Sequence, residues 1–461
     1  MPDIVTTETT VNGKEEHASA VPAYFLSLTV ENVRCFGPEQ KLNLSNGQNR
    51  PAQWSIILGN NGVGKTTLLR SLVAASPKAR IWRTGRDAQK HIFPKVFAES
   101  PHDADDFKLY RYGTKRASLA ATFFSGAKLK EAEVHGDISG FGAKIDIDGG
   151  GMARRLEPKY FEGLLCFAYG ASRRMGEGSL SEKADEDAFA SLFSDDVALM
   201  NAEEWLLQAD YAAHAASKAA VRKQASKRRD DIKDVLVHLL PEVTDIRFTR
   251  LTETRQKPGV EIKTPYGWVS ITDLSLGYKT LIAWMVDFAS RMFERYPDSS
   301  NPLAEPAVVL VDEIDLHLHP KWQRTLMGYL SERFPNTQFI ATAHSPLVVQ
   351  AAQDANIVLL RREGDHVVIE NNVEAVKNWR VDQILTSDLF GLESARPPET
   401  EKLLEARTQL LSKAKLTKKD RARLKDLEEQ IGSLPTGETP EEIEAMDVIR
   451  RAAERLKSEG L

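Results

Sequence analysis

The segment GNNGVGKT, residues 59–66, carries glycines, a lysine and a threonine at the spacing G-x-x-x-x-G-K-T. Glycines allow backbone N–H groups to curl around a phosphate, and Lys65 adds a full positive charge beside them. The hydroxyl of Thr66 can ligate Mg²⁺. This Walker A pattern predicts binding of the phosphates of ATP together with Mg²⁺. The expected nucleotide contacts are Gly59, Asn60, Asn61, Gly62, Val63, Gly64, Lys65, Thr66 and Thr67.

Two adjacent acids follow a second apolar run, in the segment AVVLVDE. The five apolar residues predict a strand buried on both faces, with Asp312 and Glu313 at its carboxyl end, where ligands bind in parallel sheets. Asp312 would hold Mg²⁺ through water, and Glu313 would orient or deprotonate the attacking water. An Asp-Glu pair after a strand is commonly a surface cap, but its place downstream of the Walker A pattern favours a Walker B motif.

The segments around these residues predict the elements that such a site needs. WSIILG before the glycine loop has the composition of a strand, and TTLLRSLVAA after it is a run of good helix formers. The segment FAYGASRR predicts another core strand that stops at Gly170. Residues 78–160 are irregular in pattern, and the glycines at 140, 142 and 149–151 predict hairpins and surface loops rather than a second core.

The segment LSLGYKT, residues 274–280, lies ahead of an apolar helical pattern. It resembles the signature motif of ABC-type ATPases, with Leu276 in place of the first glycine of the common version. The resemblance implies that Ser275 and Gly277 grip the γ-phosphate of ATP bound to the opposite protomer, with Lys279 as a further nucleotide contact. A plain helix N-cap at Ser275 is the structural alternative, and it is compatible with this role.

The segment TQFIATAHSP predicts a buried strand that ends in His344. His344 matches the switch histidine that contacts the γ-phosphate in ABC-type ATPases, so Glu313 and His344 are the expected catalytic residues. Asp315, in the turn IDLHLHP, takes the place of the D-loop that contacts the other protomer. His317 and His319 suggest a resident metal, but no third ligand is evident, so the expected metal is Mg²⁺ at Thr66 and Asp312.

Together these motifs resemble the SMC, RecF and OLD group of ABC-type ATPases, over residues 24–75 and 265–362. The early segment LTVENVRCFGP belongs to the resemblance, which implies secondary nucleotide contacts at Asn32 and Arg34. FAYGASRR, NAEEWLLQAD and WRVDQILTSDLFGL are similar to stand-alone ATPases of bacterial antiphage defence, of the Septu and retron-associated type. The Septu type works with a separate HNH nuclease. No Toprim, HNH or PD-(D/E)XK pattern is found in the sequence, so we do not expect this chain to cut DNA.

The composition is that of an ordinary soluble protein, with 42% hydrophobic residues, 28% charged residues and a net charge of −5. Its charge therefore carries no global nucleic-acid signature. Cys35 and Cys166 stand far apart, which predicts neither a disulfide framework nor a zinc site and favours the reducing cytoplasm. The polar start lacks the pattern of a signal peptide, and nowhere do 18 consecutive apolar residues predict a membrane span.

The predicted fold is α/β: an ABC-type P-loop NTPase head with a mixed sheet, a helical insertion and a C-terminal helical module. At 461 residues the chain exceeds the size that one core usually supports. The expected parts are a disordered tail at 1–22, the first half of the head at 23–194, the helical insertion at 195–242, the second half of the head at 243–380, and a helical interaction module at 381–461.

The leading hypothesis is an ATPase that closes into a head-to-head dimer, or a higher oligomer, around ATP. It would regulate a partner effector such as an HNH nuclease in antiphage defence. The alternative is a repair or recombination ATPase of the RecF or SMC type that clamps DNA itself, and a third hypothesis is an ATP-bound sensor that hardly hydrolyses. The clamp would use the basic stretch between residues 218 and 233, although a solvated helix face is favoured there. That stretch contains Lys218, Arg222, Lys223, Lys227, Arg228, Arg229 and Lys233.

Overall fold

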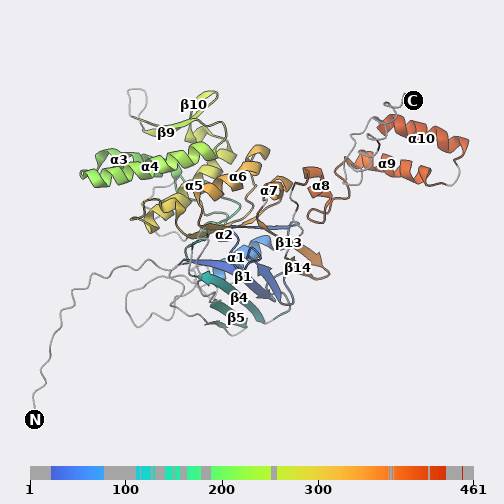
Figure 1. The fold of residues 1–461 in the computed structure, drawn as a ribbon, viewed down its shortest axis with the longest axis horizontal. Coiled ribbons are helices and arrows are strands. Elements are labelled where there is room, and N and C mark those ends of the chain that lie inside the picture. Colours follow the sequence, from blue (N-terminus) through green and yellow to red (C-terminus); the bar gives the residue numbers. More distant parts are fainter. Residues whose placement is uncertain are drawn as a thin grey trace, which may run out of the picture.

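The structure of the chain is a computed structural model (Figure 1). The predicted tail at 1–22 lies outside the described residues apart from Pro22, as does most of the C-terminal module beyond Ile431. The described residues are 22–76, 111–125 except 115, 128–129, 141–148, 151–155, 164–177, 188–250, 257–371 except 353, 373, 376, 378–413, 416–431 and 449.

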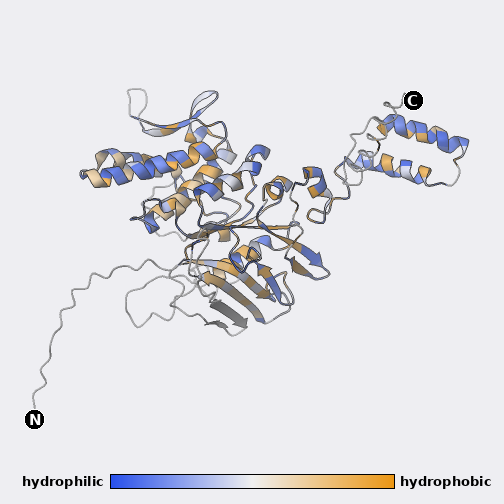
Figure 2. Cartoon of the chain, viewed as in Figure 1, coloured by the Kyte–Doolittle hydropathy of each residue, from blue (hydrophilic) through white to orange (hydrophobic). Residues whose placement is uncertain are grey.

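A six-stranded sheet forms the centre of the head. Its strand order is β14-β13-β3-β12-β11-β7, and all neighbouring strands are parallel except β13 and β14. This arrangement confirms the predicted α/β fold with a mixed sheet. Strands β3 and β11 are buried on both faces and read as continuous apolar runs, and orange predominates among the strands at the centre of the molecule in Figure 2. Their bounds are β3 (Trp54–Gly59), β7 (Cys166–Tyr169), β11 (Ala307–Val311), β12 (Thr337–Thr342), β13 (Asn356–Glu363) and β14 (His366–Glu370).

A five-stranded antiparallel sheet, in the order β2-β1-β4-β5-β6, packs with helix α1 against one face of the central sheet. Part of residues 78–160 forms the predicted hairpins, since β4 pairs with β5 and β5 with β6, but the expectation that this segment contributes no core is wrong for β4. In β4 the residues Ala117, Leu119, Ala121 and Phe123 alternate into the core, but small alanines among them weaken the apolar signal in the sequence. The elements are β1 (Ala23–Glu31), β2 (Gln40–Asn43), α1 (Lys65–Ala75), β4 (Arg116–Ser125), β5 (Phe141–Asp148) and β6 (Gly151–Arg155).

One buried amide joins the two sheets. The side chain of Gln338 on β12 accepts a hydrogen bond from the backbone N–H of Phe25 at 2.9 Å and donates one to the carbonyl of Phe25 at 2.8 Å. Both functions of the amide are therefore satisfied inside the protein, as burial requires. The bond fixes β1, and with it the turn that follows β1, relative to the strands that lead into the nucleotide loop.

Helices cover the other face of the central sheet, above it in Figure 1. The long helix α5 is the most buried of them, and a small antiparallel sheet of order β10-β9-β8 lies beside this helical layer. None of the described helices is long and apolar enough to cross a membrane. The elements are α3 (Ala202–Ala215), α4 (Ala219–Leu239), β8 (Asp245–Thr249), β9 (Gly259–Thr264), β10 (Gly267–Ser270), the 3-10 helix η4 (Ile271–Asp273), α5 (Leu276–Arg295), the 3-10 helix η5 (Pro302–Ala304), α6 (Pro320–Arg333) and α7 (Pro346–Ala351). The short helix α2 (Ala190–Phe193) packs on the opposite face, with α1.

Three further helices follow the head, and the last two project away from it in Figure 1. They are α8 (Val381–Thr386), α9 (Pro398–Leu411) and α10 (Lys418–Ile431). Among the described residues of α9 and α10 only Leu427 is buried. An ion pair of 3.5 Å between Arg407 and Glu428 links the two helices. Few side chains of this pair of helices are therefore buried among the described residues.

Candidate nucleotide-binding site

The glycine loop joins the carboxyl end of β3 to the start of α1. Gly59, Gly62 and Gly64 have φ angles of 143°, 79° and 91°, which L-residues with side chains rarely adopt. The ammonium group of Lys65 donates to the carbonyls of Gly59 at 2.8 Å and Asn60 at 3.0 Å. Burial lowers the pKa of Lys65, while the charges of nearby carboxylates act in the opposite direction. A phosphate held by the loop would compete with the two carbonyls for this ammonium group.

The loop meets the acidic pair through a chain of three short hydrogen bonds. The hydroxyl of Thr66 donates to Oδ2 of Asp312 at 2.6 Å, and the hydroxyl of Thr342 donates to Oδ1 of Asp312 at 2.6 Å. The Thr342 oxygen also accepts the backbone N–H of Glu313 at 2.7 Å. Thr342 is the last residue of β12, which lies between β3 and β11. Three neighbouring parallel strands therefore bring their carboxyl ends together at one point.

Glu313 has an unusual backbone conformation, with a φ angle of 47°. A residue with a side chain rarely adopts this left-handed region unless its surroundings hold it there. Two residues further on, the carboxylate of Asp315 accepts the backbone N–H of His344 at 3.1 Å and 3.3 Å. The predicted D-loop residue and the predicted switch histidine are thus in direct contact.

Arg173 is a residue at this site to which the sequence analysis gave no chemistry. It follows β7 in the segment GASRR, and its side chain is buried. Its guanidinium donates to the carbonyls of Gly170 at 2.9 Å, Asp312, and Glu313 at 2.9 Å. Burial lowers the pKa of Arg173 to about 10, while nearby carboxylates, Asp312 most strongly, act to raise it. Arg173 is therefore charged at neutral pH. The sequence shows an arginine pair shortly after β7, but it does not show which strand lies beside β7.

Asn32 and Arg34, the predicted secondary contacts, lie in a tight turn after β1. Both have positive φ angles, 53° and 49°, and the turn is closed by a 2.8 Å bond from the Asn32 N–H to the Gly37 carbonyl. The thiol of Cys35, the residue after Arg34, donates to the carbonyl of Val63 at 3.4 Å. The turn therefore packs directly on the glycine loop. Burial raises the pKa of the Cys35 thiol, which keeps it protonated at neutral pH.

The signature segment lies at the N-terminus of α5. Ser275 is the exposed N-cap residue, and its hydroxyl caps no backbone N–H among the described residues. Leu276 points outward, with 53% of its surface exposed. Gly277 packs so closely on the carbonyl of His317 that a Cβ atom would collide with it. This explains why leucine is accommodated at the first glycine position of the motif whereas the second position requires glycine.

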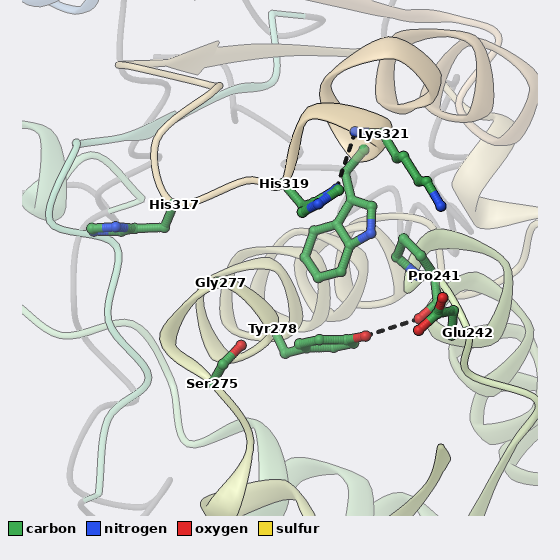
Figure 3. A pocket seen from close by; sticks show the side chains of 9 residues that line it. Pro241, Glu242, Ser275, Gly277, Tyr278, His317, His319 and Lys321 are labelled. Atoms are coloured by element: carbon green, nitrogen blue, oxygen red, sulfur yellow. Dashed lines mark hydrogen bonds between the residues drawn. The ribbon is translucent and has the colours of Figure 1, made fainter. Parts of the chain in front are cut away.

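A cavity of about 370 Å³ opens beside this helix end (Figure 3). The Tyr278 and Trp322 rings meet edge to face in its wall, with their centroids 4.6 Å apart. The wall is formed by α5, α6, the turn before α6 and the two residues Pro241 and Glu242 that follow α4. Lys279, the third predicted contact of this segment, lies one turn inside α5, where its backbone N–H bonds to the carbonyl of Ser275 at 3.1 Å. No residue of the Gly59–Thr66 loop lines the cavity. The lining residues are Pro241, Glu242, Ser275, Gly277, Tyr278, His317, His319, Lys321 and Trp322.

His317 and His319 lie in the exposed turn before α6. His319 Nδ1 accepts the backbone N–H of Lys321 at 3.3 Å, which makes His319 the N-cap of α6. In the part of the chain that the structure describes, no group of three or more His, Cys, Asp or Glu side chains is arranged to hold a metal ion. A Mg²⁺ ion at Thr66 and Asp312 would therefore need the oxygens of phosphate and water to complete its shell.

The basic helix α4 carries many of its charges in ion pairs. Lys227 pairs with Asp231 at 2.6 Å, and Lys233 approaches Asp245 at 3.4 Å. Arg229 lies between Asp210 on α3, at 3.0 Å, and its neighbour Asp230. These pairs neutralise part of the positive stretch, which reduces its attraction for a phosphate backbone.

Comparison with known proteins places this site in a family context. Residues 55–350 match the family described as "AAA domain, putative AbiEii toxin, Type IV TA system". The Septu protein PtuA of Bacillus mycoides (strain KBAB4) is 26% identical over 395 residues, which cover 85% of this chain and 48% of PtuA. The retron Ec83 probable ATPase of Escherichia coli is 33% identical over 203 residues, 43% of this chain and 35% of that protein. The match thus spans half or less of each relative.

Among solved structures, the SMC head domain from Thermotoga maritima aligns with 77% of this chain and 99% of its own length. Its TM-score is 0.39 and its sequence identity is 16%. Values this low carry no conclusion about function. The relatives confirm the predicted resemblance to Septu and retron ATPases. The family match starts inside β3 and ends inside α7, so it contains the glycine loop, the acidic pair and His344. This chain is a member of the AAA-domain family whose model it matches over those residues.

Proposed function

We propose that the protein binds ATP with Mg²⁺ and hydrolyses it to ADP and phosphate. The observation that carries this proposal is the hydrogen-bond chain from Thr66 through Asp312 and Thr342 to Glu313, which joins the phosphate loop to the acidic pair. The membership in the AAA-domain family and the similarity to a retron ATPase support it. These side chains have the donors and acceptors that Mg²⁺ and a γ-phosphate need.

Each predicted residue has a role in this proposal. The backbone N–H groups of the glycine loop and the ammonium of Lys65 bind the phosphates, and Asn32 and Arg34 make secondary contacts with the nucleotide from the turn after β1. Thr66 and Asp312 hold Mg²⁺, which neutralises the charge on the phosphates when bound. Glu313 orients and deprotonates the attacking water. His344, held through Asp315, contacts the γ-phosphate.

We propose further that the complete site needs a second copy of the chain. Ser275, Gly277 and Lys279 would contact ATP held by the other protomer. The cavity that Ser275 lines contains no residue of the chain's own glycine loop, which supports a role toward another molecule. The exposed Leu276 beside it supplies apolar surface that an interface would bury. The N-terminus of the 20-residue helix α5 would add a favourable dipole toward phosphate.

The nucleotide state would then be passed to a partner effector, which we propose is a nuclease in antiphage defence. The similarity to the Septu protein PtuA and to the retron ATPase supports this assignment. The exposed helices α9 and α10 offer a surface separate from the head for such a partner. Closing and opening of the dimer would bias the partner between two states.

The substitution Glu313→Gln tests the catalytic assignment. We expect ATP turnover to fall by about 100-fold or more, because the amide cannot deprotonate water, while ATP binding is retained. The trapped ATP should shift the protein toward the dimer in size-exclusion chromatography with light scattering. Unaltered hydrolysis in the purified variant would remove Glu313 from the mechanism, and a monomer in saturating ATP would argue against the dimer.

A further inference from the structure

Arg173 binds the backbone of the acidic pair, Asp312 and Glu313. Its guanidinium reaches the carbonyls of both Asp312 and Glu313, and also the carbonyl of Gly170 at the end of β7. The side chain is only 3% exposed, so these bonds are shielded from water. We propose that Arg173 is a positioning residue for ATP hydrolysis, which holds Glu313 in the backbone conformation that aims its carboxylate at the attacking water. This inference rests on the proposed ATPase function.

The conformation of Glu313 needs such support. Its φ angle of 47° is one that residues with a side chain adopt only when neighbours hold them there. The N–H of Glu313 is bonded to Thr342 Oγ1 at 2.7 Å, and its carbonyl to Arg173 Nη2 at 2.9 Å. Both peptide groups that flank the Glu313 side chain are therefore fixed, one from β12 and one from the loop after β7.

The carboxylate of Asp312 is held in a different way. Its two oxygens accept bonds from Thr66 and Thr342, and Arg173 contacts only the backbone carbonyl of Asp312. Loss of the guanidinium should thus leave the proposed Mg²⁺ ligand in place while it frees the peptide after Glu313. This difference separates a role in aiming Glu313 from a role in binding the metal.

The arginine fork suits this task better than a lysine. A guanidinium presents several N–H donors in one rigid plane and can span adjacent carbonyls, whereas an ammonium is a point charge on a flexible stem. Arg173→Lys keeps the positive charge among Asp312, Glu313 and Asp315, so it should preserve the fold. Arg173→Gln removes the charge as well. Arg174, next in the chain, is exposed and donates to the Asp196 carbonyl at 3.0 Å, so Arg174→Gln is a matched control.

The experiment measures ATP turnover of the full chain against ATP and against Mg²⁺, with thermal unfolding as the check on folding. For Arg173→Lys we expect kcat to fall by about 10- to 100-fold, with the KM for ATP and the Mg²⁺ requirement within about threefold of wild type. Arg174→Gln should match wild type. An unchanged kcat would overturn the proposal, as would a loss of rate that high Mg²⁺ or high ATP restores.

A double-mutant cycle with Glu313→Gln supplies a readout that a structural role would not move. If Arg173 acts through Glu313, Arg173→Lys should slow single-turnover hydrolysis no further once Glu313 is replaced. Multiplicative losses would overturn the proposal. If Arg173→Gln does not fold, Arg173→Lys and the double-mutant cycle still test whether Arg173 acts through Glu313. Absence of turnover in the wild-type chain would instead count against the proposed function itself.

Discussion

At the scale of single residues, the site depends on the hydroxyl of Thr342, which belongs to none of the sequence motifs. Thr342 is the last residue of β12, and its one hydroxyl donates to Asp312 and accepts from Glu313. It joins the proposed metal ligand to the proposed catalytic base. The residue is fully buried, so each of these bonds replaces water that is absent from the interior.

Replacement of Thr342 by valine, which has nearly the same shape, should therefore cost both stability and activity. We expect the free energy of unfolding to fall by about 1–3 kcal/mol, because a buried N–H and a carboxylate oxygen lose their partner. ATP turnover should also fall, because Glu313 is less well held. The measurements are urea unfolding and steady-state hydrolysis.

Thr337, at the other end of the same strand, gives the matched control. It is equally buried, but its hydroxyl has no hydrogen-bond partner among the described residues. Thr337→Val should therefore leave stability unchanged or raise it. Equal losses in the two variants would show that the hydroxyl network at Thr342 contributes nothing specific.

The glycine loop and the acidic pair were predictable because each is a short, contiguous pattern next to its own strand. Arg173 and Thr342 were not, because they reach the site only when β7 and β12 take their places beside β11 in the parallel sheet. The order of strands is a non-local property, and no spacing in the sequence encodes it. Strand β4 was missed for another reason, since alternating alanines give little apolar signal.

At the scale of elements, the buried carboxylate of Asp287 connects α5, the helix that follows the signature segment, to the central sheet. Asp287, in the middle of α5, accepts a bond of 2.9 Å from the hydroxyl of Tyr169 on β7 and one of 2.8 Å from Arg291. Burial, and then the charge of Asp287, raise the pKa of Tyr169, so the phenol remains a donor. The strand that leads to Arg173 is thereby tied to α5, the helix whose N-cap is Ser275.

Asp287→Asn should weaken this connection. The amide carries no charge to offset Arg291, whose side chain is 25% exposed, so we expect a loss of about 1–3 kcal/mol, below the figure for fully buried pairs. Urea unfolding measures it. Glu294→Gln, on the exposed side of the same helix, should change stability by less than about 0.5 kcal/mol. A loss for Asp287→Asn no larger than that of the control would show that the group is dispensable.

At the scale of the whole molecule, the arrangement of charge bears on whether the protein clamps DNA directly. Helices α3 and α4 lie on the opposite side of the central sheet from the five-stranded antiparallel sheet. Helix α4 carries the basic stretch between residues 218 and 233. Several of those charges face Asp210, Asp231 and Asp245. A DNA clamp needs net positive charge along its contact surface, and this pairing lowers it.

Charge reversal on α4 therefore distinguishes the two hypotheses. We expect the double variant Lys223→Glu and Arg228→Glu to hydrolyse ATP within about twofold of wild type and to leave any DNA affinity unchanged, because this helix is a solvated face. The affinity is measured by fluorescence anisotropy with duplex DNA at several salt concentrations, since phosphate contacts make binding strongly salt-dependent. If the wild-type chain binds DNA with a steep salt dependence and the variant loses that binding while it keeps its ATPase activity, the clamp becomes the better account. In that case α4, rather than α9 and α10, would be the surface through which the nucleotide state acts.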